Sequence, residues 1–392
     1  MSEVSNRNND AAASRKNDAA ESHTNDAAAS HKNNAAAKSS PLGGGSLWGK
    51  LLKFGVPLAI SVALCVMLFR NVDMAEMMRI IREDCDFRYI GLSVLIGIIP
   101  IIVRAQRWGI QLRAIDVNPP FRILFYSIFG TYAFNIVFPR LGEVWRSGYI
   151  AYRQDAPFSE VFGSMVADRM ADTITVALLT LVTCIFASGP FVKFVAAYPQ
   201  AYNAISSLLS SPWFWAACTA LCLGFWALMK YGKSGPIRKV RNFVKGLWDG
   251  FAAIVKMKGK GRWLLLTAIL WTCYFTQMWV AFYAFPFTRG LIAENGIMVV
   301  FICYMLSTIS MGIPSNGGIG PYQTAVLFGM QLFAPAAVMA SASSAEAFRT
   351  ASLAFGNTLL GAQTLTFIIG GIIVFILIAA DRRHNARNRS HI

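Results

Sequence analysis

Residues 121–146, FRILFYSIFGTYAFNIVFPRLGEVWR, join a long apolar run to a short charged turn. The run ends at a proline, and the turn after it contains Arg140, Gly142, Glu143 and Arg146. Proline cannot continue the hydrogen bonding of a helix, so it ends or kinks the helix at this point. In a membrane, irregular backbone is tolerated only where protein or a water-filled cavity surrounds it. The stretch therefore predicts a re-entrant helical hairpin in place of a simple membrane-crossing helix.

The composition of the whole chain places this hairpin in a membrane. Of the 392 residues, 55% are hydrophobic and only 14% are charged, whereas a soluble domain carries about a quarter charged residues. The 36 Lys and Arg outnumber the 20 Asp and Glu, which gives a net charge of +16. In a soluble protein this excess would suggest nucleic acid, but in so apolar a chain it indicates positively charged cytoplasmic loops. The sequence thus predicts an integral membrane protein with no nucleic-acid partner, and it argues against a water-soluble enzyme.

Further apolar runs define the predicted membrane spans. A second hairpin is predicted where the run Ile297–Ile313 ends at a proline, followed by a turn with Gly317, Gly318 and Gly320. Six other runs are long enough to cross the bilayer as helices. They are Leu51–Phe69, Tyr89–Leu112, Ser164–Ala187, Pro212–Met229, Trp263–Phe285 and Leu353–Ala379.

The loop charges predict the orientation of these spans. The segment Lys230–Arg262 holds ten Lys and Arg against one Asp, so we place it in the cytoplasm, together with both termini. We place Asn71–Arg88, Ser188–Ser211 and Pro286–Gly296, which carry fewer basic residues, outside. Six spans then alternate only if the first hairpin enters from the cytoplasm and the second from outside. We therefore predict an all-α polytopic membrane protein with about six full transmembrane helices and two re-entrant helical hairpins in an inverted repeat.

Two polar tails flank the predicted membrane domain, which covers residues 47–380. Residues 1–46 form a polar tail that we expect to be a disordered tether, because nothing in it can bury a core. Residues 381–392 form a basic cytoplasmic tail. The N-terminal tail holds four imperfect octapeptides, which begin at Asn9, Asn17, Asn25 and Asn33.

The cytoplasmic segment 234–262 contains an amphipathic pattern over Pro236–Lys256. Such a pattern predicts a helix that lies on anionic headgroups, and binding of a partner protein is the alternative. The apolar residues recur every three or four positions, at Ile237, Val240, Val244, Leu247, Phe251 and Ile254. The basic residues among them are Arg238, Lys239, Arg241 and Lys245.

Charged residues at membrane depth are the main candidates for a functional site in the first half. A charge in hydrocarbon costs about 2.5–3.5 kcal/mol, so such residues are expected to pair or to line a wet cavity. The planar guanidinium groups of Arg140 and Arg146 suit a phosphate, and Glu143 and Asp168 can hold them until it binds. An ion-pair lattice that only joins two helices is the alternative. The candidate residues are Asn135, Arg140, Gly142, Glu143, Arg146, Asp168, Arg169 and Asp172.

The second hairpin supplies the candidates of the second half. Flexible backbone and the following helix N-terminus can present free N–H groups to an anion, and a plain bend between helices is the alternative. The candidates here are Gly317, Gly318, Gly320 and Gln323, followed by Glu346 and Arg349 before the last span. All four histidines lie in the terminal tails, so the sequence predicts neither a metal site nor a cofactor in the membrane core.

Three motifs in this order resemble the lysylphosphatidylglycerol synthase transmembrane-region family, whose members are also described as flippase-like membrane domains. The motifs are Asn135-x-x-x-Pro-x-x-Gly-Glu-x-x-Arg146, Asp168-Arg-x-x-Asp172 and Pro314-x-x-Gly-Gly-x-Gly320. The resemblance covers about residues 47–380. It implies a bacterial inner-membrane protein that binds or translocates an anionic lipid, such as a phospholipid, an aminoacyl-phospholipid or a polyprenyl-phosphate conjugate. Assembly of the protein into a homo-oligomer is a further possibility that the sequence leaves open.

Two departures from the family pattern bear on mechanism. Many relatives carry Glu where this chain has Gln323, which puts a proton or cation role at that position in doubt. The chain also has no room after Ala380 for a synthase domain, so we expect no lysyl transfer and no enzyme activity. Two other functions stay open. One is a non-transporting scaffold for envelope assembly, and the other is a membrane transferase on lipid-linked sugar, although no nucleotide-sugar site is recognisable.

Overall fold

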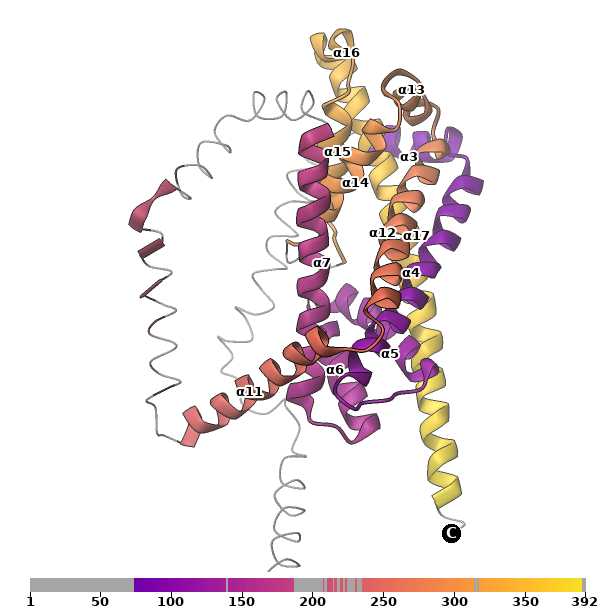
Figure 1. The fold of residues 1–392 in the computed structure, drawn as a ribbon. Coiled ribbons are helices and arrows are strands. Elements are labelled where there is room, and N and C mark those ends of the chain that lie inside the picture. Colours follow the sequence, from indigo (N-terminus) through magenta and orange to yellow (C-terminus); the bar gives the residue numbers. More distant parts are fainter. Residues whose placement is uncertain are drawn as a thin grey trace, which may run out of the picture. The chain divides into compact units, whose positions relative to one another are not determined.

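A computed structural model describes residues 74–138, 140–186, 235–313, 315 and 317–389, together with isolated positions between 207 and 230. Contacts divide the chain into the units Met1–Lys53 and Phe54–Ile392, and every described residue lies in the second unit. Each regular element in these described ranges is a helix (Figure 1), which confirms the prediction of an all-α protein.

Several predictions fall on residues that the structure does not describe. These are the tail 1–46, the run Leu51–Phe69 and most of the run Pro212–Met229. The prediction of six full spans therefore stays a prediction. At the other end of the chain, the last helix continues to Arg389, so most of the basic tail 381–392 is helical.

The helices of the first half run from α3 to α7. Short loops join them. Asp86 caps α4 from the position before its first residue, because its side chain accepts a hydrogen bond from the Arg88 backbone N–H. The elements are α3 (Met74–Glu83), α4 (Phe87–Arg113), α5 (Phe121–Val137), α6 (Leu141–Gln154) and α7 (Phe158–Phe186). The predicted span Ser164–Ala187 falls on α7, a single helix of 29 residues.

The helices of the second half begin with α11, which falls in the segment 234–262 that the loop charges place in the cytoplasm. They are α11 (Gly235–Lys256), α12 (Lys260–Ala281), the 3₁₀ turn η1 (Phe282–Ala284), α13 (Pro286–Asn295), α14 (Met298–Ser310), α15 (Pro321–Gln331), α16 (Ala336–Ala340) and α17 (Ala342–Arg389). The amphipathic pattern of residues 236–256 thus forms one helix, as predicted. The second predicted hairpin forms from α14, a turn and α15.

Among the described helices, three are long and apolar enough to cross a membrane. They are Phe87–Arg113, Lys260–Ala284 and Ala342–Asp381. These helices match the predicted spans Tyr89–Leu112, Trp263–Phe285 and Leu353–Ala379. The protein is therefore a helical membrane protein with three such spans in its described part, or four if a bent helix pair counts as one.

The first helix of that bent pair lies in the connection Pro286–Gly296, and the second lies in the run Ile297–Ile313 of the predicted second hairpin. The connection forms α13, which meets α14 at an angle of 112°. A proline at the first turn of α13 suits a helix start, because its missing N–H has no partner to lose there. Gly296 ends the helix with φ +65°, a conformation that glycine adopts at little cost. The connection is thus a short helix in its own right.

Both predicted hairpins are built from helices shorter than the roughly 20 residues that a membrane crossing needs. The first pairs α5, of 17 residues, with α6, of 14 residues. The second pairs α14, of 13 residues, with α15, of 11 residues. Such lengths suit hairpins that enter and leave on one side. Their re-entrant placement in a membrane stays a prediction.

The helix α17 connects the two hairpins. It packs against α5 and α15, and near its C-terminal end Asp381 forms ion pairs with Arg122 of α5, at 3.3 Å, and Arg153 of α6, at 3.7 Å. The open end of the first hairpin therefore lies at the C-terminal end of α17. In Figure 1, α11 lies toward this end and α13 and α16 lie toward the other, as the loop charges predict.

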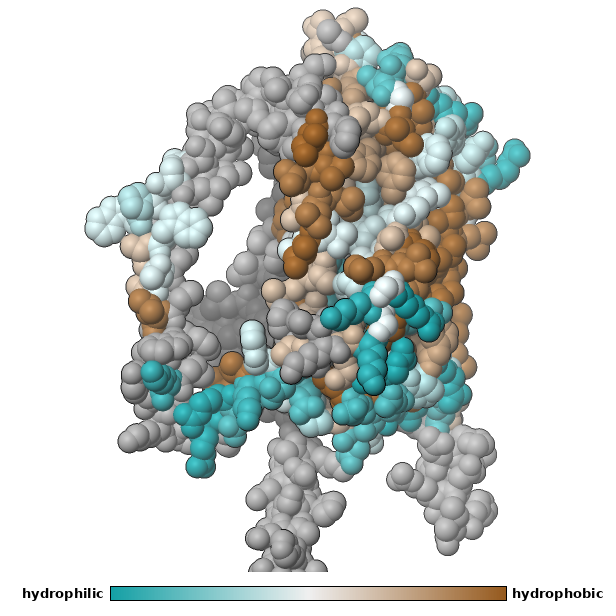
Figure 2. Space-filling view, viewed as in Figure 1, coloured by the Kyte–Doolittle hydropathy of each residue, from teal (hydrophilic) through white to brown (hydrophobic). Residues whose placement is uncertain are grey.

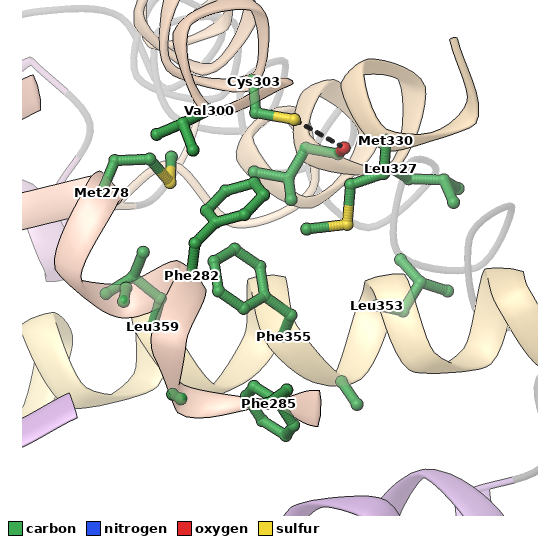
Figure 3. Close-up of a cluster of buried hydrophobic side chains, with 14 of the residues drawn as sticks. Met278, Phe282, Phe285, Val300, Cys303, Leu327, Met330, Leu353, Phe355 and Leu359 are labelled. Carbon is green, nitrogen blue, oxygen red and sulfur yellow. Dashed lines mark hydrogen bonds between the residues drawn. The ribbon is translucent and has the colours of Figure 1, made fainter. Parts of the chain in front are cut away.

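A buried apolar cluster holds the second hairpin to its neighbours (Figure 3). Phe282, Phe285 and Phe355 are fully buried, and the ring of Phe355 meets the other two rings edge-on at centroid distances of 4.9 and 6.0 Å. Aromatic rings prefer such edge-to-face contacts. Cys303 and Met330 of α14 and α15 complete this side of the cluster. The hairpin is thus anchored to α12 and α17 by apolar packing, while its turn is left to face the first hairpin.

Candidate functional site

Six charged side chains from three helices meet in one group, called here the arginine–aspartate cluster. Arginine can hold two carboxylates at once because its guanidinium group is planar and carries several donors. Four of the six side chains are almost fully buried, with exposed fractions of 0–7%, so their contacts are largely shielded from solvent. The members are Arg104 and Arg107 of α4, Arg146 of α6, and Asp168, Arg169 and Asp172 of α7.

The two aspartates lie one helical turn apart on α7 and share their arginine partners. Arg107 donates to both, at 2.7 Å to Asp168 and 2.6 Å to Asp172. Arg104 donates to Asp172 at 2.8 Å. Arg169 contacts both carboxylates, at 3.1 and 3.2 Å. The spacing of three residues on α4 and four on α7 places all these groups on facing sides of two packed helices.

Arg146 has the least complete set of partners in the cluster. Its side chain is 1% exposed and lies 3.8 Å from Asp168, which is an ion-pair distance but too long for a hydrogen bond. Its guanidinium carbon sits 4.2 Å from the centre of the Trp108 ring, a cation–π contact. Among the described residues, its Nε and Nη2 atoms have no hydrogen-bond partner. The structure thus supports the predicted pairing of Asp168 with Arg146 and leaves donor capacity on the arginine.

The cluster carries more positive than negative charge. Four arginines face two aspartates, so an excess of two positive charges remains within it. Buried charges are stable only when they are paired and hydrogen-bonded, and an unpaired one is costly. The arrangement therefore favours an anion close to the cluster. In the described ranges, no group of three or more His, Cys, Asp or Glu side chains could hold a metal ion.

A cavity of about 340 Å³ lies beside the cluster and is partly open. Its charged lining residues are Arg104, Arg140, Glu143 and Arg169, so positive charge again prevails. The remaining wall combines hydroxyl and amide groups with apolar side chains such as Ile101, Met278, Leu359, Leu360 and Phe367. The predicted residues Asn135, Gly317 and Gly318 also line it. Both hairpins therefore contribute to one cavity.

The turn of the first hairpin is a compact unit built on Asn135. Its side-chain oxygen accepts a hydrogen bond from the Gly142 backbone N–H at 2.8 Å, and its amide nitrogen donates to Glu143 at 3.4 Å. A Cβ atom on Gly142 would collide with the Thr131 carbonyl oxygen and with the Asn135 side chain. The sequence predicts that Glu143 helps to hold an arginine. Its carboxylate accepts from Asn135, and it lies close enough to Arg146 to attract that charge, although among the described residues no arginine nitrogen is within 4 Å of it.

Replacing Gly142 by alanine is expected to lower the thermal stability of the protein. The added methyl group would push against both the Asn135 side chain and the Thr131 carbonyl oxygen. Gly148→Ala is the matched control on the same helix, since the atom nearest to its new Cβ is 3.9 Å away. Alanine there should be neutral or slightly stabilising, because it is the better helix former. Thermal unfolding in detergent measures both variants. Equal stability of Gly142→Ala and Gly148→Ala would contradict the close packing of this turn.

The tips of the two hairpins are in direct contact. The Arg140 guanidinium group donates to the carbonyl oxygens of Met311 and Gly312, at 3.1 and 2.6 Å. The Gly317 backbone N–H donates to the Asn135 carbonyl oxygen at 3.2 Å. Arg140 itself has φ +64°, which is uncommon for a residue other than glycine and often marks a functional position. The predicted phosphate ligand Arg140 thus joins the hairpins while it lines the cavity.

Other predicted residues of the second half lie apart from the cavity lining. Gln323 is buried and accepts a hydrogen bond from the Gly320 N–H at 2.8 Å, while its amide nitrogen donates to Asn357 at 3.1 Å. Gln323 therefore stabilises the start of α15. Glu346 and Arg349 are half-buried in the first turns of α17, and the described cavity lining includes neither residue.

The sequence analysis missed the two arginines of α4. Arg104 and Arg107 interrupt the predicted span Tyr89–Leu112, and a charge inside a span is by itself a sign of function. It also missed the tyrosines around Arg104. The Tyr274 hydroxyl lies 3.5 Å from the Arg104 guanidinium and 3.5 Å from the Tyr132 hydroxyl. Neutral aromatic residues give no such sign in a chain that is 13% aromatic.

The fold and site together define a polytopic helical membrane protein with a positively charged cavity between two helical hairpins. Comparison with known families agrees with this description: the family model described as lysylphosphatidylglycerol synthase TM region matches residues 55–361. The chain belongs to this family, as its motifs predict. No curated protein and no solved structure matches the chain.

Proposed function

We propose that the protein binds the phosphate of an anionic membrane lipid in the cavity and moves the lipid between the leaflets of a bacterial inner membrane. The observation that carries the proposal is the excess of arginine charge at and behind the cavity wall. A phosphate on Arg104, Arg140 and Arg169 would compensate this excess by charge-assisted hydrogen bonds. The proposal contains no covalent step and therefore no enzyme activity.

The rest of the cavity suits a lipid better than a free anion. Apolar side chains make up much of its wall, and acyl chains need such a surface because burying apolar area is favourable.

The contact between the hairpin tips supports movement of the lipid between leaflets. Arg140 holds two backbone carbonyls that have no charge of their own, so an entering phosphate is a stronger partner for it than the carbonyls. Binding would then loosen the tips.

A non-transporting scaffold that presents lipid to an envelope enzyme is the second candidate. Arg107 favours it, because this fully buried side chain bonds both aspartates and is not among the cavity-lining residues in the described part of the chain. Such an ion pair joins helices whether or not lipid moves. The two candidates differ in one measurable property, which is movement of lipid between leaflets by the purified protein.

Vesicles that contain the purified protein are expected to move labelled phosphatidylglycerol between leaflets faster than labelled phosphatidylcholine. Arg169→Gln should slow this movement about tenfold or more, because a hydrogen bond to a charged group is worth about 1.5–3 kcal/mol. Arg122→Gln is the matched control, since Arg122 forms an ion pair with Asp381 and lies outside the described cavity lining. It should leave the movement unchanged. Binding of phosphatidylglycerol without movement would favour the scaffold.

A further inference from the structure

The amphipathic helix α11 has two distinct exposed faces. Each residue of an α-helix advances 100° around the helix axis, so Arg238, Arg241 and Lys245 lie within one narrow arc. All three are exposed. The next arc around the helix carries Val240 and Trp248, which are 45% and 65% exposed. Cations therefore stand directly beside exposed apolar side chains, and Figure 2 shows the hydrophilic atoms gathered along this part of the molecule.

A third side of α11 packs against α7. The Phe243 ring lies 6.5 Å from the rings of Phe158 and Phe162, measured between centroids. A Cβ atom on Gly246 would collide with the side chain of Ser159, so this glycine allows close approach of the helices. The α7 contact thus uses Phe243 and Gly246, on a different side of α11 from the cationic and apolar arcs. The cationic arc and the exposed side chains of the apolar arc therefore point away from this α7 contact.

We propose that these two arcs lie on the headgroup layer of an anionic membrane leaflet. An interfacial helix needs cations that reach lipid phosphates and apolar side chains that enter the acyl boundary just beneath them, which is the order found on α11. Residues 235–256 carry five Lys and Arg against one Asp, so the charge is complementary to anionic lipid. The neighbouring helix α12 is one of the membrane-length helices, which keeps α11 close to the bilayer.

This attachment has a geometric consequence for the cluster. Phe162, which contacts α11, precedes Asp168 by six residues on α7, or about 9 Å along the helix axis. A lipid-bound α11 would hold this end of α7 at a fixed depth. The proposal concerns a surface outside the cavity, so it does not depend on lipid transport.

Amide hydrogen exchange of the full chain in nanodiscs tests the proposal. Exchange across residues 235–256 should be slower in phosphatidylcholine with phosphatidylserine than in phosphatidylcholine alone. The triple variant Arg238→Gln, Arg241→Gln, Lys245→Gln should lose this difference. At the usual strength of surface cations, the three changes should shift the ratio of lipid-bound to released helix by about a hundredfold.

The matched control removes three exposed cations elsewhere, by Arg79→Gln, Arg82→Gln and Arg88→Gln on α3 and the start of α4. This variant should keep the lipid-dependent slowing at α11. Equal exchange of the wild type in both lipids would overturn the proposal. So would slowing that survives in the α11 triple variant, because the cations of α11 would then not be its cause. Slowing that appears only when another protein is added would favour a partner protein.

Discussion

Asp168→Asn is expected to lower the free energy of unfolding by about 3–5 kcal/mol, the usual cost of removing one partner from a buried charge pair. Asp168 is fully buried and lies within 4 Å of four arginines. Asparagine keeps the shape of the side chain but removes its charge. The cluster would then hold four arginines against Asp172 alone, and the excess positive charge would rise from two to three.

Thermal unfolding in detergent, with and without anionic lipid, measures this loss. Glu76→Gln is the control, because it also removes a carboxylate that pairs with an arginine, Arg79, but at an exposed position on α3. Exposed ion pairs contribute little, so this variant should unfold like the wild type. Added phosphatidylglycerol should recover part of the stability lost in Asp168→Asn. Wild-type stability of Asp168→Asn would contradict the charge balance assigned to the cluster.

Arg104→Gln is expected to reduce lipid movement by about tenfold or more while the protein stays folded. Asp168→Asn, in contrast, is expected to lose stability. Arg104 lines the cavity, so its loss removes a charged donor from the proposed phosphate site. Asp172, which accepts a hydrogen bond from Arg104, keeps its contacts with Arg107 and Arg169, at 2.6 and 3.2 Å. Because the cluster has excess positive charge, removing one arginine relieves repulsion while it breaks one pair. Stability without lipid should therefore change little.

Transport in vesicles and thermal stability are measured on the same preparation of Arg104→Gln. Arg289→Gln serves as the control, since this exposed arginine of α13 donates to the Tyr283 carbonyl oxygen and stands outside the cavity lining. It should match the wild type in both measurements. Transport by Arg104→Gln at the wild-type rate, or a loss that follows only the amount of folded protein, would favour the scaffold.

Much of the helical framework could be predicted because its signals are local. Long apolar runs predicted the helices at Tyr89–Leu112, Trp263–Phe285 and Leu353–Ala379, since hydropathy over about 20 residues decides membrane partition. The end of α5 followed from proline chemistry, and the turn after it followed from glycine beside charged residues. The helix within the connection Pro286–Gly296 was not predicted. A ten-residue helix between two apolar segments leaves only a weak pattern in the sequence.

The candidate site was predicted in part for the same reason. Arg140 and Glu143 stand beside a recognisable turn, and both line the cavity as expected. Gln323 also stands beside a glycine turn, yet its hydrogen bonds go to Gly320 and Asn357. Residue type and spacing identify a polar side chain near a turn. They do not tell which way it points, because that depends on what packs against it.

The sequence by itself determined that this chain is a helical membrane protein with charged turns and a known family pattern. Only the tertiary structure decided which charges meet. Arg107 and Asp168 lie 61 residues apart in the chain and 2.7 Å apart in space, because α4 and α7 present their polar sides to each other. The contact of Arg140 with Gly312 spans 172 residues. Helix periodicity depends on residues that are close in the sequence. The balance of buried charge, in contrast, arises only when distant helices pack and exclude water.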